Sequence, residues 1–272
     1  MYTALHISVF YDIQTKRPSD MVYSKRNGSL PQQVGRRKDL GVFMKDSLLA
    51  LRERFINKKQ VSDLLYCTLK EAIAAGIMPP GYRLKEEELA DWFEVSRTPC
   101  REAIKRLEYE GFVTSDHLHG SVVHKFELDE CLDTLEMLEW LRNIAIDFLN
   151  GRIPKTLLMQ IEMNLQNGET LSDPAEQFEN NVEFHSLLIR ATGNSELIRI
   201  TRQLEYRERT ISNTILMYKY HEDYVSQHRA LFTAIMDNDR AFIENYKLRN
   251  REHANKYMNM LIAKFIKDKD SI

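Results

Sequence analysis

Basic side chains recur at helical spacing in the stretch SRTPCREAIKRLE, which begins at Ser96. Arg97, Arg101 and Lys105 are four residues apart and therefore lie on one side of a helix, while apolar residues between them form its buried stripe. Ser96 is of a type that caps helix N-termini. The major groove of B-DNA accommodates one helix, and arginine can bind both phosphates and guanine edges. The stretch therefore predicts a DNA-binding helix.

The sequence around this helix predicts further elements that would position it. Apolar residues at helical spacing predict a helix over residues 61–75 and a shorter one over 84–93, with residues 94–95 as a tight connection into the arginine helix. Two β-prone runs, 112–114 and 121–123, then predict a two-stranded wing. This order of elements is that of a winged helix-turn-helix.

The segment PGYRLKEEELADWFEVSRTPCREAIKRLEYEGFV, followed by HGSVV, resembles the DNA-binding domain of the GntR superfamily of bacterial transcription regulators. In that family, the start of the recognition helix and the tip of the wing contact DNA. The resemblance implies contacts from Ser96, Arg97, Thr98, Pro99, Arg101, His119 and Gly120, and the helical spacing adds Lys105. Some members have an arginine where this chain has Glu87, so we expect no DNA contact there. The alternative is that the arginines only solvate a surface helix.

The remainder of the chain has the pattern of an antiparallel helical bundle. Amphipathic helices, separated by short breaks, are predicted over 129–149, 155–167, 175–192, 195–218, 221–237 and 240–266. We therefore expect a mainly α protein, with a winged helix-turn-helix DNA-binding domain at 59–125 and an all-α effector-binding and dimerisation domain at 126–272.

A basic leader is expected at residues 1–58, partly disordered and with an additional helix at 44–57. The chain has a net charge of −2, but residues 1–59 have twelve Lys or Arg against five Asp or Glu, a net charge of +7. The leader could follow the DNA backbone or form a solvated tail, the latter being expected for residues 11–41. A third interpretation is that translation begins at Met44.

Two segments of the bundle resemble the FCD effector domain, named after the C-terminal domain of the regulator FadR. They are NVEFH, which begins at Asn181, with ATGN after it, and QHRA, which contains His228. The resemblance implies a small-molecule effector, typically a small carboxylate, a sugar acid or an acyl thioester. Many FCD domains also hold a divalent metal through one aspartate and three histidines. The matching positions here are Asn181, His185, His228 and Asn250.

Two interpretations of these four positions remain open. In the first, His185 and His228 still hold zinc, nickel or manganese in a weakened site, with His253 as a substitute ligand one turn from Asn250. In the second, the two histidines are buried and hydrogen-bonded to the two asparagines, with no metal. The second agrees better with the loss of the carboxylate, because amide oxygens are weak ligands for zinc-class ions.

Polar side chains of the bundle are the candidates for effector binding: Asn181, His185, His228, Asn250, Arg142 and Arg207. Each arginine taken alone is more commonly a surface residue. Without a metal to anchor a carboxylate, we expect an organic acid or acyl derivative that is less charged or bulkier than a small carboxylate.

Several other classes of protein find no support in the sequence. It contains no nucleophile elbow, no phosphate-binding glycine loop and no HExxH helix, which argues against an enzyme. It has no run of about 18 apolar residues, and its three cysteines form no disulfide framework, as expected in a reducing cytoplasm. We predict a homodimeric, cytoplasmic, nucleoid-associated repressor that binds a pseudo-palindromic operator. The alternatives are a ligand-independent architectural DNA binder and, less favoured, a metal-dependent hydrolase built on His185 and His228.

Overall fold

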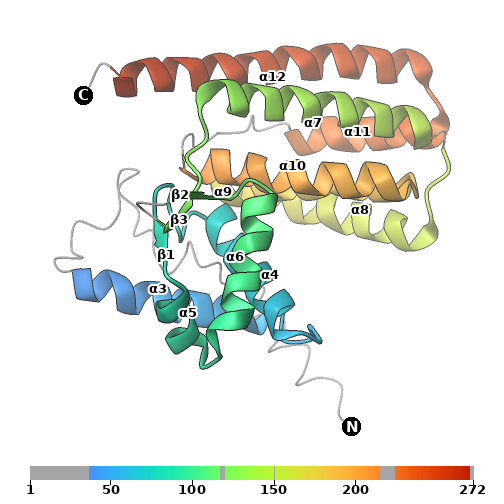
Figure 1. The fold of residues 1–272 in the computed structure, drawn as a ribbon. Helices are drawn as coiled ribbons and strands as arrows, with labels where there is room; N and C mark the ends of the chain where they lie inside the picture. Colours follow the sequence, from blue (N-terminus) through green and yellow to red (C-terminus); the bar gives the residue numbers. More distant parts are fainter. Residues whose placement is uncertain (1–36, 117–119, 150, 215–223, 270–272) are drawn as a thin grey trace, which may run out of the picture. The chain divides into compact units, whose positions relative to one another are not determined.

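A computed structural model of the chain describes residues 37–116, 120–149, 151–214 and 224–269 (Figure 1). The chain divides into two compact units, Met1–Lys125 and Phe126–Ile272. The predicted mainly α fold is confirmed, with a small sheet in the first unit and helices throughout the described part of the second.

The first unit is a helix-turn-helix with a small sheet. Its described elements are α3 (Arg37–Glu53), α4 (Val61–Ala74), β1 (Arg83–Leu84), α5 (Glu86–Phe93), α6 (Arg97–Tyr109), β2 (Val113–Asp116) and β3 (Gly120–Val123). Helix α6 packs against α4 and α5, and α3 packs against α4. Their apolar faces meet in a core that includes Leu65, Leu69, Phe93, Leu107 and Phe112, all nearly inaccessible to solvent. This core fixes which side of α6 remains outside.

The two predicted wing strands are confirmed as β2 and β3, and the sheet contains a third strand, β1, that the sequence did not predict. The order is β1-β3-β2, and both pairings are antiparallel, with Arg83 opposite Val122 and Val113 opposite Val123. Leu84, which we expected in the second helix, is buried in β1, while Arg83 beside it points outward. A two-residue strand is too short to show alternation in the sequence, and only its pairing with β3 defines it.

The helix before the winged unit also differs from the prediction. Helix α3 begins at Arg37 and ends at Glu53, rather than covering 44–57, and so includes the end of the segment expected to be a solvated tail. It is held by Met44, Leu48 and Leu51, which recur at helical spacing and are buried. The rest of the basic leader, residues 1–36, lies outside the described residues.

The tight connection between α5 and α6 is confirmed, although three residues, 94–96, separate the helices rather than two. Glu94 ends α5 in the left-handed conformation, with φ of 55°, and the Val95 amide donates to the Ala90 carbonyl at 3.0 Å. A left-handed residue reverses the chain within one peptide unit, which sets the angle at which α6 leaves α5.

The second unit is a bundle whose described helices are α7 (Leu128–Leu149), α8 (Lys155–Gly168), α9 (Pro174–Ala191), α10 (Ser195–Thr214), α11 (Tyr224–Asp237) and α12 (Arg240–Lys269). The six predicted helices are confirmed, although residues 215–223, where two of them were expected to end and begin, lie outside the described part. Helix α9 packs against α7, α8 and α10, and α12 runs beside α7 and α11 (Figure 1). Within the described residues, no helix is long and apolar enough to cross a membrane.

Local signals in the sequence explain where two bundle helices begin. The Asp173 carboxylate accepts hydrogen bonds from the amides of Ala175 and Glu176, and Pro174 occupies the first helical position of α9. The Asn194 side chain caps α10 by accepting from the amides of Glu196 and Leu197.

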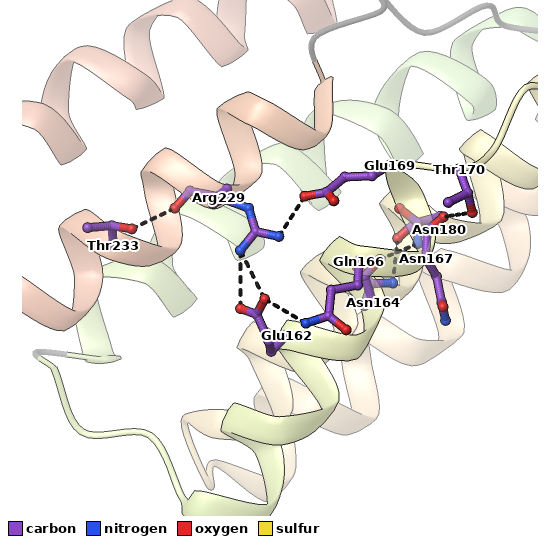
Figure 2. Close-up of polar contacts among 9 residues, drawn as sticks. All are labelled: Glu162, Asn164, Gln166, Asn167, Glu169, Thr170, Asn180, Arg229 and Thr233. Carbon is purple, nitrogen blue, oxygen red and sulfur yellow. Dashed lines mark hydrogen bonds and ion pairs between the residues drawn. The ribbon is translucent and has the colours of Figure 1, made fainter.

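A network of polar side chains joins α8 to α9 and α11 (Figure 2). Arg229 of α11 donates to Glu162 at 3.0 and 3.2 Å and to Glu169 at 2.7 Å. Asn164 and Asn180 donate to each other's backbone carbonyls at 3.1 and 2.9 Å. Because Arg229 directly follows His228, the network also holds the part of α11 that carries this histidine.

Candidate nucleic-acid interface and effector site

The predicted DNA-contacting residues of α6 lie on its solvent side. Ser96, Arg97, Thr98, Arg101 and Lys105 are exposed, and Pro99 is half-buried. The opposite side of the helix is buried through Cys100, Ala103, Ile104 and Leu107. Ser96 occupies the N-cap position, but its side chain makes no capping hydrogen bond, contrary to the expected capping role.

Both arginines at the start of α6 are paired with carboxylates of α5. Arg101 donates from Nε and Nη2 to Glu86 at 2.9 and 2.8 Å, and this hydrogen bonding lowers the pKa of the Glu86 carboxyl. Arg97 forms an ion pair with Glu87. The guanidinium groups are thus charge-paired within the protein while remaining on its surface.

Arg106 belongs to the same helix but has a different environment. Its guanidinium lies 3.9 Å from the centroid of the Tyr66 ring and is ion-paired with Asp63. Tyr66 and Asp63 are both on α4, so Arg106 attaches α6 to α4.

The wing places an arginine that the sequence analysis did not include among the candidates. Gly120 has φ of +69°, and a Cβ built there would lie 3.7 Å from Nη2 of Arg83. The Arg83 guanidinium therefore covers the wing glycine, and this exposed side chain joins the candidate DNA-facing group. A basic residue before a buried Leu84 was the only sequence signal. His119, the other predicted wing contact, lies outside the described residues.

In the bundle, the two predicted histidines lie close together and are almost fully buried. The rings of His185 and His228 are 5.1 Å apart, and each residue is 4% exposed. The His228 ring stacks on the Phe184 ring, with their centroids 4.0 Å apart. The Tyr224 ring meets the His228 ring edge-on, at a centroid distance of 5.7 Å. Burial, reinforced by the nearby Arg142 charge, lowers the pKa of His228 to about 3 and that of His185 well below its ordinary range. Both imidazoles are therefore neutral at physiological pH.

Arg142 is buried next to these histidines, so the expectation that it lies on the surface was wrong. Its guanidinium donates to both carboxylate oxygens of Glu208, at 3.1 and 2.6 Å. A buried arginine needs an anionic partner to offset its loss of hydration. The sequence around Arg142 does not show that Glu208 supplies this partner, because the two residues lie on different helices. Arg207 is half-buried, with its guanidinium 5.9 Å from the Phe126 ring centroid.

The two asparagines do not have equivalent roles. Asn250 donates to Oε2 of Glu139 at 2.8 Å, and Asn143 donates to Oε1 of the same carboxylate at 3.0 Å. The expected hydrogen bond between Asn250 and a histidine is therefore corrected to one with Glu139. Asn181 is buried on α9, one turn before His185.

The donor atoms around the histidines do not match a zinc-class metal site. Among the described residues, no group of three or more His, Cys, Asp or Glu side chains could hold an ion. Asn181 and Asn250 offer neutral amides, and Glu139 is occupied by two amide donors. His253, the suggested substitute ligand, is half-buried on α12.

One further buried carboxyl group adjoins this cluster. The Glu205 carboxyl of α10 lies near Arg142 and Glu208, and burial raises its pKa to about 7. Within the described residues, Oε1 of Glu205 and Nδ1 of His228 have no hydrogen-bond partner. Buried polar atoms are normally paired, so the cluster can form additional hydrogen bonds.

Comparisons with known proteins agree with both units. Residues 62–123 match the profile of bacterial regulatory proteins of the gntR family, and residues 133–245 match the FCD domain. The chain is 25% identical over 197 residues to the uncharacterized HTH-type transcriptional regulator YdhC of Bacillus subtilis, covering 71% of this chain and 84% of that protein. It is 24% identical over 208 residues to the gluconate operon transcriptional repressor of Bacillus licheniformis, covering 74% and 81%.

A solved structure supports the fold. The chain resembles E. coli McbR/YncC with a TM-score of 0.62 at 17% identity, covering 76% of this chain and all of that one. The two profile matches follow one another along the chain, and the exposed basic face of α6 and the buried polar cluster lie in the corresponding units. The chain is therefore a DNA-binding transcription regulator of the GntR family, with an FCD domain as its C-terminal effector-binding unit.

Proposed function

We propose that this regulator is a cytoplasmic repressor that acts as a homodimer on a pseudo-palindromic operator. The observation that carries the proposal is the solvent side of α6, where Arg97, Arg101 and Lys105 are exposed over a helix buried on its other face. A two-fold dimer would bring one such helix to each half-site. Repression agrees with the gluconate operon repressor among its relatives.

The second copy in this proposal has a candidate docking surface on α7. Met137, Trp140, Ile144 and Phe148 recur at helical spacing and are 49%, 49%, 42% and 61% exposed. A surface helix normally presents polar residues to water, so a line of four large apolar side chains favours burial against another chain. A second copy supplies the same line, as a symmetric interface requires.

We infer that the effector binds at the buried polar cluster of the bundle without a metal. The buried charged side chains of the described bundle residues are Glu139, Glu205, Glu208 and Arg142, and Arg142 already binds Glu208. Arg142 already donates to Glu208 through both of its Nη atoms, so an organic acid would compete with Glu208 for this guanidinium. An effector rich in hydroxyl groups, which both donate and accept hydrogen bonds, would instead satisfy Glu205 and His228. The alternative is the organic acid or acyl derivative expected from the sequence.

Selection from a random double-stranded DNA library tests the DNA-binding part of the proposal. Purified full-length protein should enrich an inverted repeat whose half-sites are about one helical turn, or a multiple of it, apart. Failure to enrich any sequence, at salt concentrations that permit binding, would contradict an operator-binding role.

Thermal-shift screening with matched amines, polyols and carboxylates tests the effector part. A ligand that stabilises the wild type should change operator affinity by a factor of about 5–150, as expected for allosteric coupling. His185→Ala should abolish this response and leave operator binding without ligand intact. If the variant loses operator binding equally with and without ligand, His185 is structural; if carboxylates alone stabilise the protein, the inferred effector class is wrong.

A further inference from the structure

The acidic residues of α5 lie directly against the basic start of the recognition helix. Glu86, Glu87 and Glu88 form its first turn. Glu86 and Glu87 are paired with Arg101 and Arg97 of α6, whereas Glu88 lies 3.9 Å from Lys85 and is not paired with α6. Two of the three carboxylates are therefore ion-paired with the arginines that we expect to bind DNA.

The two pairs differ in geometry and exposure. Glu86 receives two parallel hydrogen bonds from Arg101 and is 33% exposed, so it orients that guanidinium and leaves Nη1 outside the pair. Glu87 is joined to Arg97 by one contact, and the side chains are 70% and 59% exposed. A single-contact pair in water contributes little stability and exchanges readily with another anion.

DNA phosphate is such an anion. If Arg97 leaves Glu87 for a phosphate, one anionic partner replaces another, and the uncompensated Glu87 carboxylate remains beside the negatively charged DNA. A guanine edge can offer two hydrogen-bond acceptors to the Arg97 guanidinium, whereas Glu87 makes a single contact with it. Glu87 therefore opposes backbone binding more than binding to a base.

We propose that Glu87 is a specificity-determining residue, which competes with DNA for Arg97 and suppresses binding to non-operator DNA. This inference rests on the proposed binding of DNA through α6. Its consequence is that removing the Glu87 charge should strengthen binding to random sequence more than binding to the operator.

Glu87→Gln and Glu88→Gln provide a matched test, because both remove one negative charge from the same turn. Of these two glutamates, only Glu87 is paired with α6. Fluorescence anisotropy would use full-length protein, a random-sequence 30-base-pair duplex and the operator recovered by selection. For Glu87→Gln, we expect affinity for the random duplex to rise about 3- to 10-fold and the dependence on salt to steepen by about one released ion. The ratio of operator to random affinity should fall. Glu88→Gln should change either affinity less than about twofold, since its effect is only a screened charge at longer range.

A double-mutant cycle with Arg97→Ala tests whether Glu87 affects DNA binding through Arg97. In that background, Glu87→Gln should give no more gain than Glu88→Gln. A full gain without Arg97, or equal effects of the two glutamine variants in the wild-type background, would overturn the proposal. Absence of DNA binding by the wild type would instead refute the proposed function itself. Melting curves of every variant would identify any affinity change that results from unfolding.

Discussion

At the scale of single residues, the arginines of α6 divide into two groups by what they contact. Arg106 is held between Tyr66 and Asp63 of α4, whereas Arg97 and Arg101 face outward and contact only exposed or partly exposed carboxylates of α5. The first contact joins two helices of the core, and we expect the other two to be exchanged for contacts with DNA.

Substitution of these arginines should separate the two roles. Arg97→Ala and Arg101→Ala should each weaken operator binding by about 1–3 kcal/mol if they bind bases. Arg106→Ala should lower the melting temperature, through loss of its contacts with α4, and leave the preference among operator variants unchanged. The measurement is binding to a set of singly substituted operators. Unchanged affinity in both Arg97→Ala and Arg101→Ala would mean that another element binds DNA.

Glu205 predicts a specific dependence of stability on pH. Because burial raises its folded pKa to about 7 from an ordinary value of 4.5, the protonated form is favoured by folding. The stability that it contributes is present below about pH 4.5 and is lost as the pH rises through about 7. Glu205→Gln should therefore stabilise the protein at pH 8 by roughly 2–3 kcal/mol more than at pH 5. Urea unfolding at both pH values measures this, and an equal effect at the two would show that the carboxyl is not buried in its neutral form.

At the scale of elements, the turn between α5 and α6 contains a strained residue. Glu94 has φ of 55°, which costs an L-residue roughly 1–2 kcal/mol, whereas glycine adopts it readily. Glu94→Gly should therefore raise the free energy of unfolding by about 1 kcal/mol, after the entropy cost of glycine is subtracted. Glu108→Gly, at an exposed helical position of α6, should lower it by about 1 kcal/mol. A loss of stability in Glu94→Gly would contradict the left-handed turn.

The junction of α8, α9 and α11 leaves no room for a side chain at Gly168. A Cβ there would lie 2.6 Å from Oδ1 of Asn180 and 2.8 Å from Cγ2 of Val225. Gly168→Ala should destabilise the bundle by about 1–3 kcal/mol, because Asn180 is held by Asn164 and Tyr224 and cannot easily move. Gly41→Ala is the control: its Cβ would meet nothing within 4 Å, so alanine should stabilise α3. If Gly168→Ala and Gly41→Ala change the melting temperature equally, Gly168 is not closely packed against Asn180 of α9.

At the scale of the whole molecule, the exposed apolar line on α7 predicts how two copies associate. Trp140→Asp places a charge in the centre of this line and should convert the dimer to a monomer, as measured by light scattering after gel filtration. Affinity for the inverted repeat should then fall by at least an order of magnitude, because the two recognition helices no longer bind as one unit. Met159→Asp, at a position of α8 that is 70% exposed, is the matched control and should leave the dimer intact. A dimeric Trp140→Asp variant would place the interface elsewhere.

The sequence by itself determined the features that depend on neighbours along the chain. Helical spacing of apolar residues located α4, α6 and the bundle helices, and the alternation of basic and buried positions showed which side of α6 remains exposed. These features are local, because a helix completes its own hydrogen bonds and its buried face follows a fixed period. Both ends of α3 and the two-residue strand β1 were missed, since their limits are set by packing and by pairing with β3 rather than by a pattern of their own.

The tertiary structure alone decided which side chains of different helices meet. It paired Arg142 with Glu208, 66 positions away, and Asn250 with Glu139, 111 positions away, where the sequence suggested a surface arginine and a histidine partner. It also joined Glu87 to Arg97 and placed Arg83 over the wing glycine. Such contacts are governed by the desolvation of charges and amides between packed helices, which no periodicity along one helix records. The sequence therefore identified the exposed basic helix that we propose binds DNA, and the packing of the bundle determined which polar groups lie together at the proposed effector site.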